Sequence, residues 1–140
     1  MKSYDYYKIT ELIDLPTEIQ HYVLNCVREG VNKGIIKNLD RFRTLKYCIY
    51  TSQILAISSN FKIKVVEGIT INEKGKKFIH SWNEYKGYHF NLIKGYNNKI
   101  LHYGRITESK KFLKHLKKHS TENETIYTTI FPLLYPPECN

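Results

Sequence analysis

Apolar residues recur at helical spacing in three stretches of this chain. The first begins at Pro16 and is expected to end at Gly30. The second covers 48–59, and Asn60 behind it is suited to the left-handed turn that ends a helix. The third covers about 107–118, where an apolar stripe faces a row of lysines. The pattern therefore predicts three helices.

Between the second and third helices the apolar period shortens to two, which is typical of strands. A turn at Lys86-Gly87 joins two of these runs as a hairpin. Helices then strands, a further helix and a last strand predict an α+β domain, with N-terminal helices packed on an antiparallel sheet. The predicted strands are 61–71, 78–85, 88–93, 99–103 and 125–131.

The chain of 140 residues is short enough to form one domain, expected over 1–140. Its 22 lysines and arginines against 13 aspartates and glutamates give a net charge of +9. This charge suits an acidic substrate or a nucleic acid, and it also suits a lysine-rich surface that only contacts solvent. The lysines of 110–118 and the 12 tyrosines keep a nucleic-acid-binding protein among the open classes.

The three cysteines are Cys26, Cys48 and Cys139. An odd number is typical of free thiols in a reducing compartment. The sequence has neither a signal-peptide pattern nor about 18 consecutive apolar residues, so we expect a cytoplasmic protein without a membrane partner. The sequence has no Cys-x-x-Cys motif and no cysteine–histidine pair at zinc spacing, so a structural metal is not expected. No other cofactor is expected. Cys26 falls on an apolar helix face, and Cys139 is expected to be exposed.

Candidate chemistry comes from Cys48, His80 and Asn91. A thiol becomes a nucleophile when a base takes its proton and a third group orients that base. Amides in the first turn of a helix favour a thiolate, and Cys48 opens the second predicted helix. The predicted hairpin brings Asn91 back toward the strand that carries His80. His89 shares the face of Asn91 and competes with it as a second polar neighbour.

These residues resemble the transglutaminase-like branch of the papain-like cysteine enzymes. The sequence His80-Ser81-Trp82-Asn83-Glu84 is similar to the His-Ala-Trp-x-Glu signature of that family. Leu55-Ala56 followed by 62–68 is similar to the family's stretch into its first core strand, and Gly87 with Asn91 matches a later Gly-x-x-x-Asp. The resemblance covers about 44–93, and small stand-alone relatives include the leader-peptide-cleaving proteases of lasso-peptide biosynthesis. Asparagine at 91 and serine at 81 replace the family's aspartate and alanine.

The resemblance implies a transglutaminase-like core with Cys48 as nucleophile, His80 as base and Asn91 as the orienting residue. It also makes Trp82 and Tyr47 candidates for substrate binding. The implied reaction is acyl transfer through a thioester, most simply hydrolysis of a peptide or side-chain amide. Transamidation uses the same residues. The expected substrate is a peptide or protein, and acidic groups on it would match the basic charge.

Two alternatives stay open beside this hypothesis. The chain is also consistent with a binding module that keeps the fold without catalysis. In that case Cys48 is a small buried residue, and His80 is a strand histidine satisfied by hydrogen bonds. An occluded thiol, or a thiol far from His80, would favour the module. Glu84 is expected to be a solvated charge in either case.

Overall fold

Helices and strands form an α+β arrangement, which confirms the predicted class. The computed structural model describes residues 4–36, 48–92, 101–119 and 131–137. The helices in these segments are α1 (Thr17–Asn32), α3 (Cys48–Ser58) and α4 (Ser109–His119), with a 3-10 helix at Leu12–Asp14. The strands are β1 (Asp5–Tyr7), β2 (Thr10–Glu11), β3 (Lys64–Ile71), β4 (Lys77–Tyr85), β5 (Tyr88–Asn91) and β6 (Leu101–Ile106).

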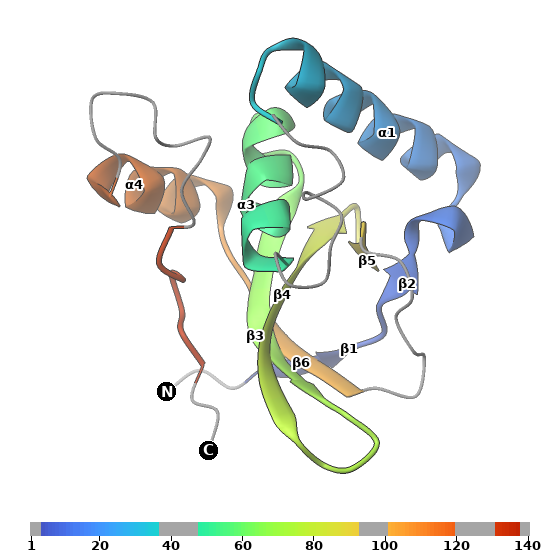
Figure 1. The fold of residues 1–140 in the computed structure, drawn as a ribbon, viewed down its shortest axis with the longest axis vertical. Helices are drawn as coiled ribbons and strands as arrows, with labels where there is room; N and C mark the ends of the chain where they lie inside the picture. Colours follow the sequence, from blue (N-terminus) through green and yellow to red (C-terminus); the bar gives the residue numbers. More distant parts are fainter. Residues whose placement is uncertain (1–3, 37–47, 93–100, 120–130, 138–140) are drawn as a thin grey trace.

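The described strands form one curled sheet in the order β1-β6-β3-β4-β5-β2 (Figure 1). The sheet is mixed, because β2 runs parallel to β5 while the other pairs are antiparallel. The prediction of a purely antiparallel sheet was therefore wrong at this edge. β1 and β2 span three and two residues, too few to give a period-two pattern in the sequence. The strand expected at 125–131 lies outside the described residues except for Phe131, which is not in a strand.

α3 matches its predicted span to within one residue, and Asn60 behind it has the expected left-handed backbone (φ 56°). Phe61 is also left-handed (φ 64°), so β3 begins only at Lys64. The predicted end of α1 at Gly30 was wrong. That glycine is buried, and a Cβ there would lie 2.6 Å from the Ser58 Oγ, so its size serves the packing of α1 on α3.

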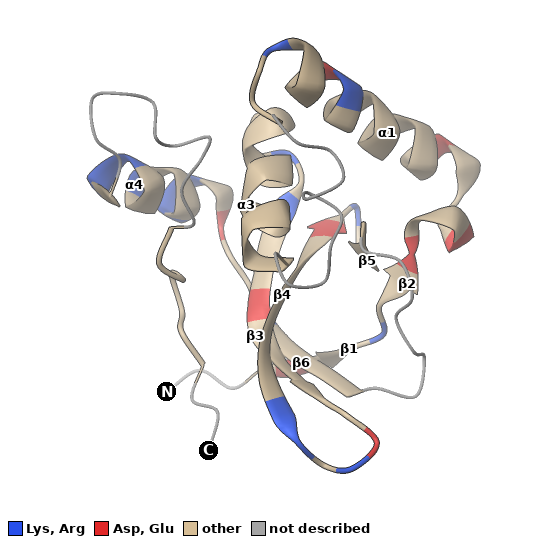
Figure 2. Ribbon diagram, viewed as in Figure 1, with Lys and Arg blue, Asp and Glu red and all other residues tan. Residues whose placement is uncertain are grey.

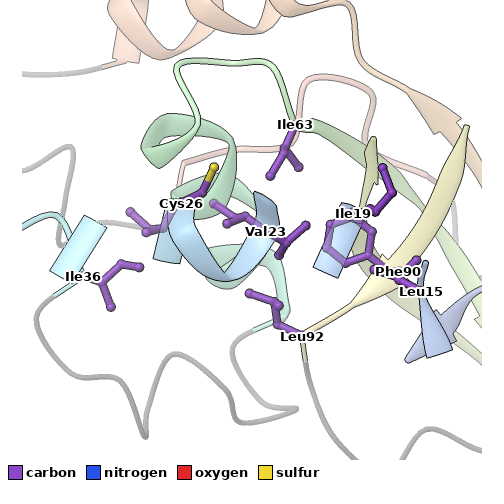
Figure 3. Packing of buried hydrophobic residues seen from close by; sticks show 10 residues of the cluster. Leu15, Ile19, Val23, Cys26, Ile36, Ile63, Phe90 and Leu92 are labelled. Carbon is purple, nitrogen blue, oxygen red and sulfur yellow. The ribbon is translucent and has the colours of Figure 1, made fainter. Parts of the chain in front are cut away.

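α3 lies on the sheet between α1 and α4 (Figure 1). Its central six residues, 51–56, are buried all round, which explains why the helix has no polar face. The α1 side holds the larger core, where Val23 and Cys26 pack near Ile63 and Leu92 (Figure 3). The buried position of Cys26 confirms its expected place on an apolar face.

The segment 131–137 packs beside α3, β3 and α4, and buried polar side chains hold it there. Both the amide and the carbonyl of Phe131 bond to the Gln53 side chain at 3.0 Å. The Glu67 carboxylate accepts the backbone amides of Leu134 at 2.8 Å and Tyr135 at 2.5 Å. Burial raises the pKa of Glu67, although these two amides oppose the rise.

None of the described helices combines the length and hydropathy that a membrane crossing needs.

Candidate active site

The first turn of α3 meets β4 at the position of Cys48. This residue is half-buried, and the backbone amide of Ser81 hydrogen-bonds to its thiol. In the described chain, β5 pairs with β4 along 83–85, so the thiol contacts β4 beyond that paired stretch. Ser81 directly follows His80 in β4, so the thiol approaches the strand at the residue next to the predicted base, whose side chain projects from the other face of the strand.

Two opposing effects act on the Cys48 thiol. Burial raises its pKa, while the amides of Ser81, Ile49 and Cys48 itself lower it. The sequence correctly predicted that helix amides lower the pKa of the Cys48 thiol, but burial raises this pKa by more. The thiol is therefore protonated at neutral pH in the free protein.

His80 is 2% exposed and hydrogen-bonds to the Asn91 side chain. Burial and the neighbouring His102 lower the pKa of His80 to about 3, although the bond to Asn91 acts to raise it. The imidazole is thus neutral at physiological pH. One ring nitrogen of a neutral imidazole carries no hydrogen, and a general base needs such a nitrogen to accept a proton.

Asn91 reaches His80 because the β4–β5 hairpin has the predicted turn. Lys86 and Gly87 both have positive φ, 51° and 86°, as a two-residue turn requires. The register pairs Glu84 with His89, and continuing it sets Asn91 diagonal to His80. The Nδ2 of Asn91 is a buried donor without a partner in the described chain, so its Oδ1 accepts from the His80 ring N–H.

His89, which could have taken the place of Asn91 beside His80, instead contacts Trp82 and Tyr7. The Trp82 Nε1 donates to its Nδ1 at 2.9 Å, and the Tyr7 ring stacks on it with centroids 3.9 Å apart. Trp82 is 1% exposed and stacks on His80 at 5.6 Å between ring centroids. It presents almost no surface to a substrate, which leaves it a packing role beside His80. Tyr47, the other implied substrate-binding residue, lies outside the described residues.

His102 on β6 was not predicted from the sequence as a neighbour of His80. Its Nδ1 lies 2.9 Å from the Thr70 Oγ1, and its ring centroid is 5.9 Å from that of His80. Strand pairing explains this proximity, because Gly68 faces both His80 on β4 and Gly104 on β6. The alternation of apolar and polar residues within 99–103 indicated a strand that carries His102. Only the pairing of β3 with β6 shows that this strand brings His102 near His80.

Glu84 corrects a second expectation, because it is buried (8% exposed) and not a solvated charge. Its Oε2 accepts the backbone amide of Gly87 at 2.7 Å. The carboxylate therefore folds back onto the turn of its own hairpin, where it is satisfied without solvent.

The exposed lysines of α4 form a basic face, as the sequence predicted (Figure 2). The candidate active site is built by α3, β4 and β5, so the two features belong to different elements. Nucleic-acid binding by this face stays a prediction. Within the described segments, no three histidine, cysteine or acidic side chains are arranged to hold a metal ion.

Comparison with known proteins found no matching family model, curated protein or solved structure. The candidate chemistry therefore rests on the arrangement of Cys48, His80 and Asn91 in this chain.

Proposed function

We propose that the protein is a cysteine-dependent acyl-transfer enzyme of transglutaminase-like type that hydrolyses a peptide or side-chain amide bond. The supporting observation is that α3 places Cys48 against β4 at the residue that follows His80, while Asn91 on β5 lies beside His80. The Cys48 thiol bonds to the amide of Ser81, and the adjacent His80 bonds to Asn91. A helix that begins at the cysteine, followed by strands that carry the histidine and the asparagine, is also the order that the resemblance implies.

In the proposed reaction, the Cys48 sulfur attacks the amide carbonyl carbon while its proton passes to the unprotonated ring nitrogen of His80. The carbonyl electrons move to the oxygen, where the backbone amide of Cys48 is a hydrogen-bond donor. The tetrahedral adduct collapses, and the leaving amine takes the proton from His80. Water then attacks the thioester with His80 as base, which releases the acid and restores the thiol.

These protonation states of Cys48 and His80 predict a distinctive pH profile for the alkylation rate of Cys48. With a protonated thiol and a neutral imidazole, internal proton transfer gives a small fraction of thiolate–imidazolium pair. The thiolate raises the pKa of the imidazolium beside it, so this pair, and not a thiolate beside a neutral imidazole, is the reactive form. Its fraction does not change with pH below the point at which that imidazolium loses its proton. Alkylation of Cys48 by iodoacetamide should therefore show a pH-independent shoulder from about pH 6 to 8. The rate should rise again only as the thiol itself ionises.

Loss of this shoulder in His80→Ala tests the proposal. Without the imidazole, the rate should fall about tenfold per pH unit below the thiol pKa. Peptide mapping by mass spectrometry reads Cys48 separately from the other cysteines, and Cys26 and Cys139 serve as references. His80→Gln is a second variant, which keeps a hydrogen-bond donor but takes up no proton. A wild-type profile that both variants reproduce would contradict the proposal.

A binding module without catalysis is favoured by one observation, the 2% exposure of His80. A binding module predicts that His80→Ala and His80→Gln reproduce the wild-type alkylation profile, because Cys48 would react as an isolated buried thiol. The same measurement therefore separates the two functions.

A further inference from the structure

We propose that Ser52 and Ser81 form a hydroxyl pair that positions the Cys48 thiol beside the His80 strand. This assignment rests on the proposed function, and it makes both serines positioning residues for the reaction. The two Oγ atoms are 2.7 Å apart, and both side chains are 1% exposed. Serine at 81 is also one of the two positions at which the chain differs from the family pattern that it resembles.

The hydroxyls of Ser52 and Ser81 must hydrogen-bond to each other, although each also lies near a backbone carbonyl. The Ser52 Oγ lies 3.0 Å from the Ile49 carbonyl oxygen, and the Ser81 Oγ lies 3.0 Å from the Val66 carbonyl oxygen. If both hydroxyls donated to these carbonyls, two oxygens without a hydrogen between them would face each other at 2.7 Å. One hydroxyl therefore donates to the other, and in either direction the bond joins α3 to β4.

Ser81 contacts α3 at two successive turns. Its Oγ meets Ser52, and its backbone amide meets the thiol of Cys48, four residues earlier on the helix. Asn83 adds a third link, because its Nδ2 donates to the Ser52 carbonyl at 3.0 Å and to the Lys64 carbonyl at 3.2 Å. These bonds fix how far along β4 the helix sits.

The position along β4 decides whether the thiol meets His80. His80 precedes Ser81, so a shift of α3 along the strand moves the thiol relative to the imidazole as well as to the Ser81 amide. Displacements of about 1 Å can cost proton transfer and attack as much as 100-fold. The serine pair thus acts on Cys48 through the placement of its helix, without touching a reacting atom.

Ser52→Ala and Ser81→Ala test the pair, with Ser58→Ala as the matched control. Ser58 lies on the same helix, and its buried Oγ has no partner in the described chain. The readout is the height of the pH-independent shoulder in Cys48 alkylation, relative to the high-pH limb. We expect the shoulder to fall roughly tenfold in each of the two test variants and to keep its height in Ser58→Ala.

A purely structural role would lower the melting temperature but leave the ratio of shoulder to limb unchanged. A wild-type ratio in Ser52→Ala and Ser81→Ala would overturn the assignment while the His80-dependent shoulder still supports the proposed function. Absence of that shoulder from the wild-type protein would overturn both. If one variant does not fold, the other decides, and failure of both to fold would assign the pair to folding instead of positioning.

Discussion

Between pH 6.5 and about 4 the folded protein should lose stability steeply, because three buried histidines remain neutral in it. Burial lowers the pKa of His80 to about 3, and those of His89 and His102 to about 4, from an ordinary 6.5. The unfolded chain binds these protons near pH 6.5. Stability from the neutral imidazoles is therefore fully present above pH 6.5 and falls as the pH drops toward the folded-state values.

The expected effect is comparable with the whole stability of a small domain. Each proton bound only by the unfolded chain costs about 1.4 kcal/mol per pH unit. Three such protons lower the free energy of unfolding by at most about 6 kcal/mol between pH 6.5 and 5, against a typical 5–15 kcal/mol. Glu67 acts in the opposite direction, because burial raises its pKa and the folded chain takes up that proton first.

Urea denaturation at a series of pH values between 7.5 and 5 measures this dependence. Below about pH 6 the slope should approach three protons, and His102→Gln should reduce it there by about one third. A slope of less than one proton below about pH 6 would contradict the burial of neutral imidazoles in the folded protein.

Asn91→Asp should raise the pKa of His80 and make Cys48 more reactive at neutral pH. The Asn91 amide orients His80 by a hydrogen bond but supplies no charge. A carboxylate at the same place favours the imidazolium and raises its pKa by roughly 1–3 units. The thiolate–imidazolium pair becomes more populated by the same factor, so alkylation of Cys48 at pH 7 should accelerate about tenfold or more.

NMR titration of the His80 ring and the alkylation rate of Cys48 together measure this change. The double variant Asn91→Asp/His80→Ala is the control, because without the imidazole the carboxylate only repels a thiolate. The gain should therefore vanish or reverse there. If Asn91→Asp raised neither the pKa of His80 nor the reactivity of Cys48, Asn91 would have no influence on the pair.

The sequence predicted the parts of the site that local patterns determine. Apolar periodicity and Asn60 located α3 and so put Cys48 in its first turn. The Lys86-Gly87 turn set the register that returns Asn91 to His80. In both cases neighbouring residues in the chain fix the geometry, which is why one sequence was enough.

Contacts between distant segments could not be predicted. His102 approaches His80 only through the pairing of β3 with β6, and Ser52 meets Ser81 only once α3 is docked on β4. The pKa of the Cys48 thiol also depends on tertiary structure. The helix amides that lower it are local in sequence, whereas the burial that raises it depends on distant segments. Periodicity carries no information about either kind of contact.

Mass spectrometry of the protein mixed with p-nitrophenyl acetate tests most directly whether Cys48 attacks an acyl carbonyl with His80 as its base. The predicted result is an acetyl group on the Cys48 peptide that forms and is then hydrolysed. It should be lost in Cys48→Ala, and its formation should slow by roughly 10²–10⁴ in His80→Gln. Acetylation confined to lysines, or Cys48 acetylation at the wild-type rate in His80→Gln, would contradict the proposed chemistry.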